Sequence, residues 1–243
     1  MHSSKKEKYS QYKKNKKMHY ELTKKFFRKN AADKKGYYNS KDGEALKQDI
    51  QNRRMWEIYS SSLDGVLQNN PNIESVIDVG CGMGNFTLEL TNLKKFKKIV
   101  GIDFLKDTFD IARENAKFFE RVSFTEGDLI YMPFKDRSFD LAVCLNVLHH
   151  IHVDDFKVAI RELARITDKY LILEIRNKKN ILDMCYSKII LPKYHRKLPL
   201  YTSSIQEVNG LMKDFNFRLV NMRGERFFSW ACRHLVIVYK RIK

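Results

Sequence analysis

The stretch from Val76 to Phe86 reads VIDVGCGMGNF, an apolar run that ends in an acid and then carries three glycines at alternate positions. A strand followed by such a turn and a helical pattern is typical of an open α/β sheet, whose ligands lie outside the carboxyl ends of the strands. Glycine at Gly80, Gly82 and Gly84 permits positive φ and lets a ligand approach the main chain. The stretch therefore predicts a ligand site at this turn.

Short apolar runs alternate with helical patterns after residue 71. The runs are SVIDVG, KIVGID, VSFTEG, FDLAVCLNVL and KYLILEI. Strands rich in Val, Ile and Leu that alternate with helices indicate βαβ units and a parallel sheet buried on both faces. Two further strand patterns, FRLVNMR and HLVIVYKR, follow each other closely, which predicts an antiparallel pair at the sheet edge.

The chain divides into three parts by composition. Residues 1–17 carry clustered lysines without an apolar period, which is typical of a disordered basic arm. Residues 18–70 have helical periodicity and predict two or three N-terminal helices, with breaks near residues 36–39 and at Gly43. Residues 71–243 hold the strand pattern and include an insertion at about residues 178–203.

The net charge of +17 and the pI of about 9.6 favour anionic partners such as nucleic acid or acidic lipid headgroups. The alternative is that the lysines simply occupy solvated surfaces. We find neither eighteen consecutive apolar residues nor a secretory signal, so a cytoplasmic location is expected. The four cysteines are widely spaced, which predicts buried, reduced thiols and no metal site.

Three acids follow or precede the expected strand ends. Asp78 lies before the glycine turn, where its charge would disfavour a phosphate and favour a cation. Asp103 ends the second strand, where a carboxylate can accept both hydroxyls of a ribose; a helix N-cap is the alternative. Asp128 follows the third strand and can accept from an adenine amino group, although a Gly-Asp turn is also possible. A dinucleotide fingerprint would place its third glycine later than Gly84, and no Lys-Ser/Thr follows as in a P-loop.

Together these segments resemble the class I S-adenosylmethionine-dependent methyltransferases, in the type 11 branch with the ubiquinone and menaquinone biosynthesis methyltransferases. The resemblance spans roughly residues 75–177 and is carried by VIDVGCGMGNFT, VGIDFLKD, GDLIYMPFKDRSFDLAVCLNVLHHI and FKVAIRELARI. It implies an α/β, Rossmann-like, seven-stranded, mostly parallel sheet with helices on both faces and the last strand antiparallel. One departure is ARITDKY, which replaces the family's Leu-Arg-Pro-Gly-Gly turn and predicts an unusual turn before the fifth strand.

The resemblance implies S-adenosylmethionine as the cofactor and S-adenosylhomocysteine as the product. Asp78 and the glycine-turn main chain would hold the methionine end, Asp103 the ribose, and Phe104 or Leu105 the adenine face. The full cofactor set is Asp78, Gly80, Cys81, Gly82, Gly84, Asp103, Phe104, Asp128, Leu129 and Asn146.

Two histidines, His149 and His150, follow the fourth strand in LNVLHHIHVDD. They stand at the face where the methyl group should be presented, and imidazole titrates in the range useful for a general base. A base is needed only when the acceptor has a proton to lose. The alternative is that a histidine here orders the loop.

Further residues are candidates for contact with the substrate. Glu174 and Arg176 end the fifth strand; Arg176 can hold an anionic group or form a surface ion pair. Tyr37 and Tyr38 can cover the cofactor or pack between N-terminal helices. His195 lies in the insertion, whose mixture of apolar and basic residues suits either a membrane interface or a core helix with a basic loop.

The sequence thus predicts a methyltransferase that acts on a small, hydrophobic or lipid-like acceptor, such as a quinol, a phenol or a lipid headgroup, most often at oxygen. Peripheral contact with an acidic membrane surface is compatible with this hypothesis. The first alternative is a tRNA methyltransferase that uses the basic surface. The second is a cofactor-binding protein without activity. The oligomeric state is left open.

Overall fold

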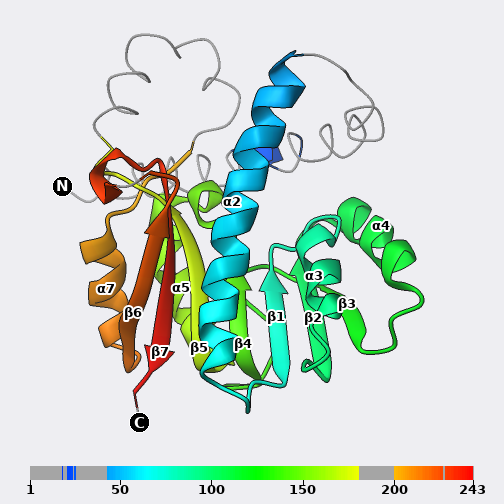
Figure 1. The fold of residues 1–243 in the computed structure, drawn as a ribbon. Coiled ribbons are helices and arrows are strands. Elements are labelled where there is room, and N and C mark those ends of the chain that lie inside the picture. Colours follow the sequence, from blue (N-terminus) through cyan, green and yellow to red (C-terminus); the bar gives the residue numbers. More distant parts are fainter. Residues whose placement is uncertain are drawn as a thin grey trace, which may run out of the picture.

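The computed structural model describes residues 18, 21–23, 25, 43–180, 200–226 and 228–242 (Figure 1). The basic arm of residues 1–17 lies outside this part of the chain. So do Tyr37, Tyr38, His195, Cys185 and most of the insertion, and the expectations for them stay predictions.

A seven-stranded sheet with the order β3-β2-β1-β4-β5-β7-β6 forms the centre of the fold. β1 to β5 are parallel, whereas β7 runs antiparallel to both of its neighbours. The strands are β1 Ser75–Val79, β2 Lys98–Asp103, β3 Val122–Glu126, β4 Phe139–Cys144, β5 Thr167–Arg176, β6 Phe217–Gly224 and β7 His234–Arg241. The predicted mostly parallel sheet and its antiparallel last strand are confirmed.

The strand order reverses between β1 and β4, which is the point where ligands bind in open α/β sheets. The parallel strands all finish at one end of the sheet, which we call the carboxyl end. Because β7 is antiparallel to β5, it begins at this end, and its first residue pairs with the last residue of β5. The ends of the parallel strands and the start of β7 therefore lie together at the carboxyl end of the sheet.

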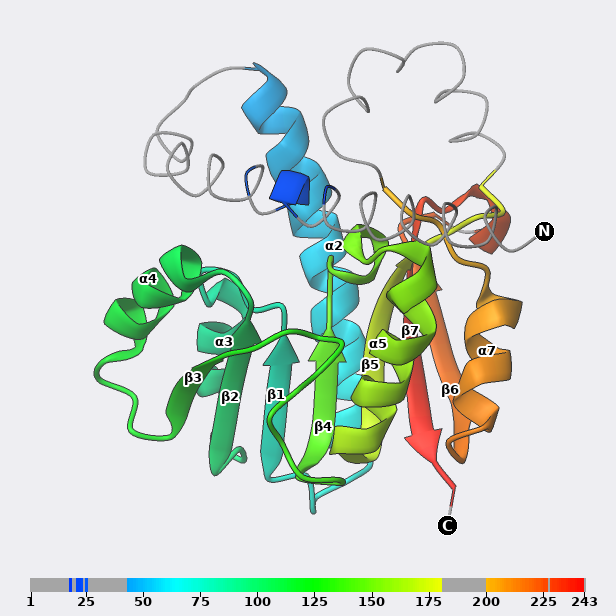
Figure 2. The same ribbon diagram turned by 180° about the vertical axis from the view of Figure 1, so that it is seen from behind.

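Helices cover both faces of the sheet. α2 and α3 lie on one face, and α5 and α7 lie on the other (Figures 1 and 2). The helices are α2 Gly43–Gln68, α3 Asn85–Glu89, α4 Lys106–Ala116, α5 Val153–Ile166 and α7 Ile205–Lys213, with short 3-10 turns at Leu90–Asn92, Leu148–His150 and Ser229–Ala231. α2 is one continuous helix that begins at Gly43, where the sequence predicts a break.

The continuous apolar strands are explained by burial on both faces. In β1, Val76 packs in the cluster beneath α2, whereas its neighbour Ile77 packs in the cluster beneath α5 and α7. Neither side chain is exposed to solvent. A strand with apolar residues at successive positions fits such a two-sided environment and not a half-solvated sheet.

The unusual connection before the fifth strand is a direct passage from helix to strand. α5 ends at Ile166 and β5 begins at Thr167 without an intervening turn. The buried Thr167 hydroxyl donates to the Leu163 carbonyl at 2.6 Å, and the Arg241 guanidinium donates to the Ala164 carbonyl at 2.6 Å. These bonds satisfy carbonyls that a helix end leaves without partners, so the glycine-containing turn is not required.

Cys81, Cys144 and Cys232 are free and buried, as predicted. Among the helices that the structure describes, none combines the length and the apolar character needed to cross a membrane.

Candidate active site

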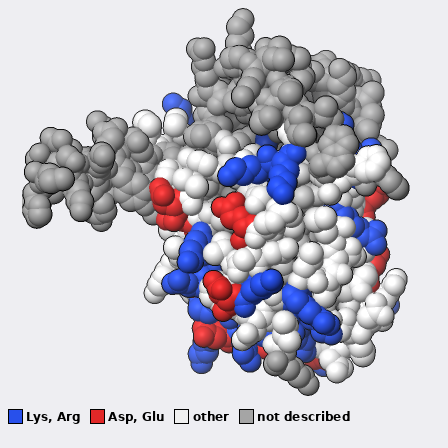
Figure 3. Space-filling view, turned by 90° about the vertical axis from the view of Figure 1, so that its left-hand side faces the viewer, with Lys and Arg blue, Asp and Glu red and all other residues white. Residues whose placement is uncertain are grey.

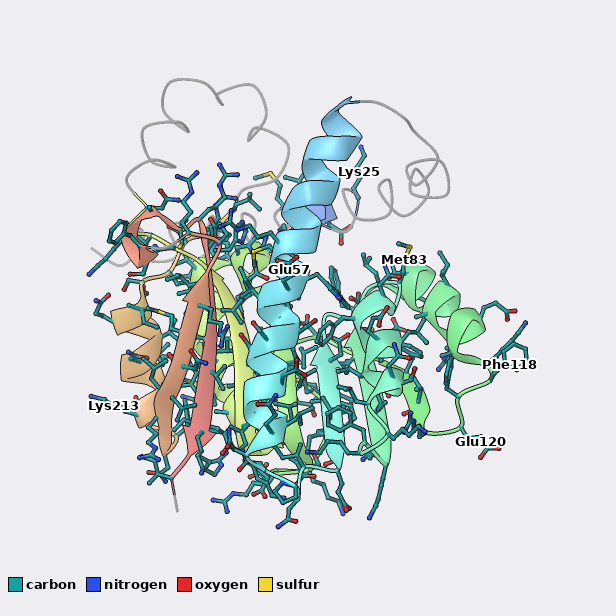
Figure 4. All side chains as sticks on the ribbon, viewed as in Figure 1. Lys25, Glu57, Met83, Phe118, Glu120 and Lys213 are labelled. Carbon is teal, nitrogen blue, oxygen red and sulfur yellow. The ribbon has the colours of Figure 1, made fainter. Side chains whose placement is uncertain are left out.

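The glycine turn is fixed to the end of β2. The amides of Gly80 and Cys81 both donate to the Ile102 carbonyl, at 2.7 and 3.1 Å, and the Gly84 amide donates to the Cys81 carbonyl at 2.9 Å. Gly80, Gly82 and Gly84 have φ of 77°, 53° and 80°, a region that L side chains rarely adopt. Met83, at the tip of the turn, lies at the same end of the sheet as Glu57 of α2 (Figure 4).

The three glycines differ in what surrounds them. A Cβ on Gly80 would lie 2.2 Å from Val147 Cγ2, and one on Gly84 would lie 2.9 Å from Ala112 Cβ. A Cβ on Gly82 would meet nothing within 4 Å. Gly80 and Gly84 are therefore required by packing within the protein, whereas Gly82 presents bare main chain to open space that a ligand can occupy.

Asp103 holds the glycine turn and the chain after β2 together. Its Oδ2 accepts from the Gly82 amide at 2.8 Å, and its Oδ1 accepts from the Leu105 amide at 2.9 Å. The N-cap of α4 is Leu105, so the predicted alternative of Asp103 as an N-cap is not observed. Burial raises the pKa of Asp103, while hydrogen bonds from Leu105 and Gly82 oppose that rise. Each oxygen keeps acceptor capacity for a ligand hydroxyl.

Asp78 is a second carboxylate at this site and is almost fully buried. The Thr87 hydroxyl of α3 donates to its Oδ2 at 2.6 Å. Burial raises the pKa of Asp78 to about 7, although the Thr87 hydrogen bond opposes the rise and the charge of Asp103 adds to it. A buried carboxylate that ionises with difficulty is stabilised by a nearby cation, so this site favours a positively charged ligand.

The remaining cofactor candidates take different positions. The Cys81 side chain packs with Ala112 and Phe124, and both of its main-chain polar groups are bonded within the protein, so it acts through the shape of the turn. Asp128 Oδ1 accepts from the Ile130 amide at 3.1 Å, which is the turn that the sequence offered as its alternative. The Leu129 side chain lies in the core, whereas Phe104 is half-buried.

Asn146 follows β4 in a left-handed conformation, with φ of 59°. Its amide donates to Glu174 Oε2 at 2.9 Å, and its neighbour Val147 packs against Gly80. A non-glycine residue in this region is uncommon and clusters at functional sites. Asn146 thus links the glycine turn to the residues at the end of β5.

Both predicted catalytic histidines lie at the carboxyl end of the sheet, with ring centroids 4.1 Å apart. His149 is buried, and its Nδ1 has no hydrogen-bond partner among the described residues. Burial lowers the pKa of His149 well below its usual value, and electrostatic repulsion between protonated His149 and its neighbours His150, His234 and Arg176 lowers it further. His149 is therefore neutral at physiological pH, and its Nδ1 is a buried polar atom that the described residues leave unsatisfied.

Glu174 joins three segments that are distant in sequence. Its Oε2 accepts from the Tyr59 hydroxyl of α2 and from the Asn146 amide, and its Oε1 lies 2.6 Å from Nδ1 of His234. The side chain is 1% exposed. Glu174 was predicted to contact the substrate; in the structure it bonds to Tyr59, Asn146 and His234 within the protein, and contact with a substrate stays a prediction.

His234 and Tyr59 are site residues that the sequence analysis missed. The signal for His234 was present, because the predicted antiparallel last strand begins at the carboxyl end of the sheet. Tyr59 gave no comparable signal within its helical pattern. Arg176 ends β5 half-buried and pairs in register with His234.

Aromatic side chains of α2 face the first turn of α3. The Trp56 and Phe86 rings meet edge to face with centroids 5.5 Å apart, and those of Tyr59 and Phe86 with centroids 6.3 Å apart. Since Phe86 follows the glycine turn directly, these rings form an aromatic wall, Trp56, Tyr59 and Phe86, beside the site. No group of three or more metal-binding side chains comes together within the described residues.

Comparison with known sequences agrees with this geometry. Residues 76–169 match the family model described as "Methyltransferase domain". Demethylmenaquinone methyltransferase of Staphylococcus aureus strain MRSA252 is 27% identical over 150 residues, which cover 58% of this chain and 60% of that protein. The chain thus aligns with about 60% of the length of the curated relatives that it matches.

Solved structures share the fold. Magnesium protoporphyrin IX methyltransferase from Synechocystis PCC 6803 with bound SAH superposes with a TM-score of 0.68 at 20% identity, covering 86% of this chain and 92% of that one. The N-methyltransferase NodS from Bradyrhizobium japonicum WM9 with bound S-adenosyl-L-homocysteine gives 0.60 at 15% identity, covering 78% and 88%.

Proposed function

We propose that this chain, a member of the class I S-adenosylmethionine-dependent methyltransferases, transfers a methyl group from S-adenosylmethionine to a small, hydrophobic or lipid-like acceptor. The observation that carries the proposal is the bare main chain at Gly82, held by Asp103 beside the buried Asp78. Bare backbone, a ribose-binding acid and a preference for a cation are together what a nucleoside sulfonium requires.

The residues of the site fit this cofactor. Asp103 would accept the ribose hydroxyls, Asp78 and the turn from Gly80 to Gly84 would hold the methionine end, and Phe104 would pack on the adenine. Asp128 and Leu129 would line the edge of the ring, and Asn146 would lie beside the methionine end. The bound cofactor supplies an electrophilic methyl group on a sulfonium. The protein then has to align the acceptor with that methyl and exclude water.

The histidines after β4 support an acceptor that has a proton to lose. Neutral His149 can form a hydrogen bond with an acceptor hydroxyl through a ring nitrogen, and His150 lies against it. An acceptor with a protonated hydroxyl group therefore fits this end of the site better than an acceptor that carries no such proton.

The aromatic wall supports a hydrophobic acceptor, because flat rings pack well against Trp56, Tyr59 and Phe86. The relatives are compatible with this, since one acts by name on demethylmenaquinone and another on magnesium protoporphyrin IX. We propose a quinol, a phenol or a lipid headgroup, with peripheral contact to an acidic membrane surface. Arg176 would hold an anionic group of the acceptor.

Transfer of labelled methyl groups tests the proposed acceptor class. Purified protein with labelled S-adenosylmethionine is offered reduced quinones, phenols, acidic phospholipid vesicles and tRNA in parallel. Label in the quinol, phenol or lipid fraction supports the proposal, and Asp103→Ala should abolish it. Label in tRNA alone would overturn the acceptor class, and transfer to none of them by a cofactor-binding protein would favour the non-enzymatic alternative.

A tRNA acceptor is the second candidate because of the net charge of +17 and the lysines at positions 94–98. On the face over α7 and β6, however, Lys and Arg side chains are interspersed with acidic and uncharged ones (Figure 3). A continuous basic track would suit the phosphate backbone better than this mixed face. We rank tRNA below a small acceptor because the aromatic wall and the two histidines beside the cofactor residues suit a small molecule.

Substitution of two neighbouring glycines should separate binding from stability. Gly82→Ala places a methyl group in the open space proposed for the cofactor, so affinity for S-adenosylmethionine should fall at least about tenfold, with about 1–2 kcal/mol of strain. Gly80→Ala adds the overlap with Val147 to the same strain and should lower the free energy of unfolding more. Calorimetric titration and urea unfolding measure both quantities. Equal affinity in Gly82→Ala and wild type would contradict the placement.

The buried carboxyl of Asp78 predicts a dependence of stability on pH. With a pKa of about 7 in the folded protein and 3.8 as the reference, the unfolded chain ionises first as pH rises. Stability of the ligand-free protein should therefore fall between about pH 4 and pH 7, by about 1.4 kcal/mol for each pH unit at most. Asp78→Asn keeps an acceptor oxygen for Thr87 but has no ionisable carboxyl. Its stability should therefore not show this fall between about pH 4 and pH 7. Urea unfolding of both proteins at several pH values tests this, and parallel stability curves would count against it.

A further inference from the structure

We propose that His234, oriented by Glu174, is the residue that receives the proton of the acceptor during methyl transfer. This inference rests on the proposed function and concerns the acceptor side of the same site. His234 is then a catalytic residue, and Glu174 is a positioning residue that acts through it.

The hydrogen bonds around Glu174 define the orientation of the His234 ring. The Asn146 main-chain amide can only donate, and the Tyr59 hydroxyl donates to the same oxygen, Oε2. Burial raises the pKa of Tyr59, and the charge of Glu174 raises it further, so the phenol stays protonated. Two donors therefore occupy Oε2, and Oε1 is left as the acceptor for a third donor.

His234 must then supply the hydrogen in its contact with Glu174. Nδ1 of the ring lies 2.6 Å from Oε1, within hydrogen-bond distance and short for a bond between nitrogen and oxygen. With Nδ1 as the donor, the neutral ring has its acceptor lone pair on Nε2. The carboxylate also stabilises the imidazolium that forms when Nε2 takes a proton. A histidine held in this way is prepared to act as a base.

The position of His234 places it among the predicted catalytic residues. It is the first residue of β7, at the carboxyl end of the sheet, and its ring meets that of His149 edge to face with centroids 6.0 Å apart. The Glu225 carboxylate accepts from its main-chain amide at 3.0 Å, so the backbone is fixed as well as the ring. The side chain keeps 12% exposure.

A division of roles between the two histidines follows from their surroundings. His149 is buried beside Arg176, which disfavours its protonated form, and it has no carboxylate partner in the part of the chain that the structure describes. His234 has such a partner. We therefore assign to His149 the hydrogen bond that orients the acceptor hydroxyl and to His234 the proton itself.

The step balances as follows for an oxygen acceptor. The hydroxyl proton passes to Nε2 of His234, and the hydroxyl oxygen forms the new bond to the methyl carbon. The bond from that carbon to sulfur breaks, and its electron pair stays on sulfur. The products are a neutral methyl ether, a neutral thioether and an imidazolium paired with the Glu174 carboxylate, which later releases its proton to water.

Nitrogen NMR of histidine-labelled protein tests the orientation without any turnover. The His234 signals, identified by their loss in His234→Gln, should show hydrogen on Nδ1 and a bare Nε2. In Glu174→Gln the side-chain amide can donate to Nδ1, so the hydrogen should move wholly or partly to Nε2. The inference is wrong if wild type carries hydrogen on Nε2, or if Glu174→Gln leaves the ring unchanged. This readout stands even if the proposed acceptor class fails.

Kinetics on the labelled-methyl reaction test the chemical role. His234→Gln and Glu174→Gln should each lower kcat about 10²- to 10⁴-fold, while the Kd for the cofactor changes less than about threefold. Added imidazole should restore part of the kcat of His234→Ala, which a purely structural role does not predict. Unchanged kcat in an active His234→Gln enzyme would overturn the inference and leave the proposed function intact.

The pH profile of kcat is a second kinetic readout. Among the described residues, the ring or its backbone is faced by His149, Glu174, Arg176 and Glu225, and Tyr59 bonds to the same Glu174. The acid limb of the wild-type profile should disappear or move in His234→Gln, and an unaltered limb would count against the assignment. Glu162→Gln, which removes a carboxylate that binds Arg165 on α5, is the matched control and should leave the profile unchanged. If Glu174→Gln fails to fold, the two His234 variants decide the matter.

Discussion

Asp103→Asn is expected to weaken binding of S-adenosylmethionine by about 10²- to 10³-fold, as measured by isothermal titration calorimetry. In wild type the carboxylate holds the Gly82 amide at 2.8 Å and the Leu105 amide at 2.9 Å. Asparagine offers one acceptor oxygen and turns an NH₂ group towards the other amide, so one bond becomes a contact between two donors. Each hydrogen bond to a charged group contributes about 1.5–3 kcal/mol, and tenfold in affinity is about 1.4 kcal/mol.

The control for this substitution is Asp136→Asn. Asp136 is an exposed carboxylate that pairs with Arg165 at 2.9 Å on another part of the surface. Its loss should leave the cofactor affinity unchanged. Affinity of Asp103→Asn within threefold of wild type would contradict the role given to this residue.

His149→Ala is expected to lower turnover about 10²-fold, because the hydrogen bond that orients the acceptor hydroxyl is lost. His149 is 5% exposed and neutral, and its Nδ1 has no hydrogen-bond partner within the described part of the chain. Because it lies beyond the cofactor residues, the affinity for S-adenosylmethionine should change little. Single-turnover transfer of labelled methyl separates the chemical step from cofactor binding.

His152→Ala is the matched control for the histidine prediction. His152 is the N-cap of α5, and its ring accepts from the Asp154 amide at 3.4 Å. Its loss should cost about 0.5–2 kcal/mol of stability and leave turnover unchanged. Equal turnover in His149→Ala and wild type would remove His149 from the mechanism.

Most of the fold could be predicted from the sequence because its strands are apolar at successive positions. Val76 and Ile77 are buried on opposite faces of β1, and this two-sided burial is what VIDV encodes. The same local logic placed Asp78 and Asp103, since each stands at a fixed distance from a strand end. The local sequence pattern is sufficient to predict a structural feature when that feature is formed by one strand and the turn that follows it.

The acceptor side of the site could not be predicted in the same way. Glu174 meets Tyr59, which is 115 residues away in sequence, and His234, which is 60 residues away. These contacts depend on how α2 crosses the sheet and on the insertion of β7 between β5 and β6. The sequence correctly located Glu174 near the end of the fifth strand. It did not reveal which groups the Glu174 side chain contacts, because those partners come from distant segments.

Calorimetric titration of the wild-type protein with S-adenosylmethionine near pH 7 tests the central claim most directly. The cradle of Gly82, Asp103 and Asp78 predicts saturable binding at one site in each chain. Because the cation favours ionised Asp78, binding should also release protons, seen as a dependence of the heat on the buffer. Absence of binding would contradict the assignment of this site to a methyl donor.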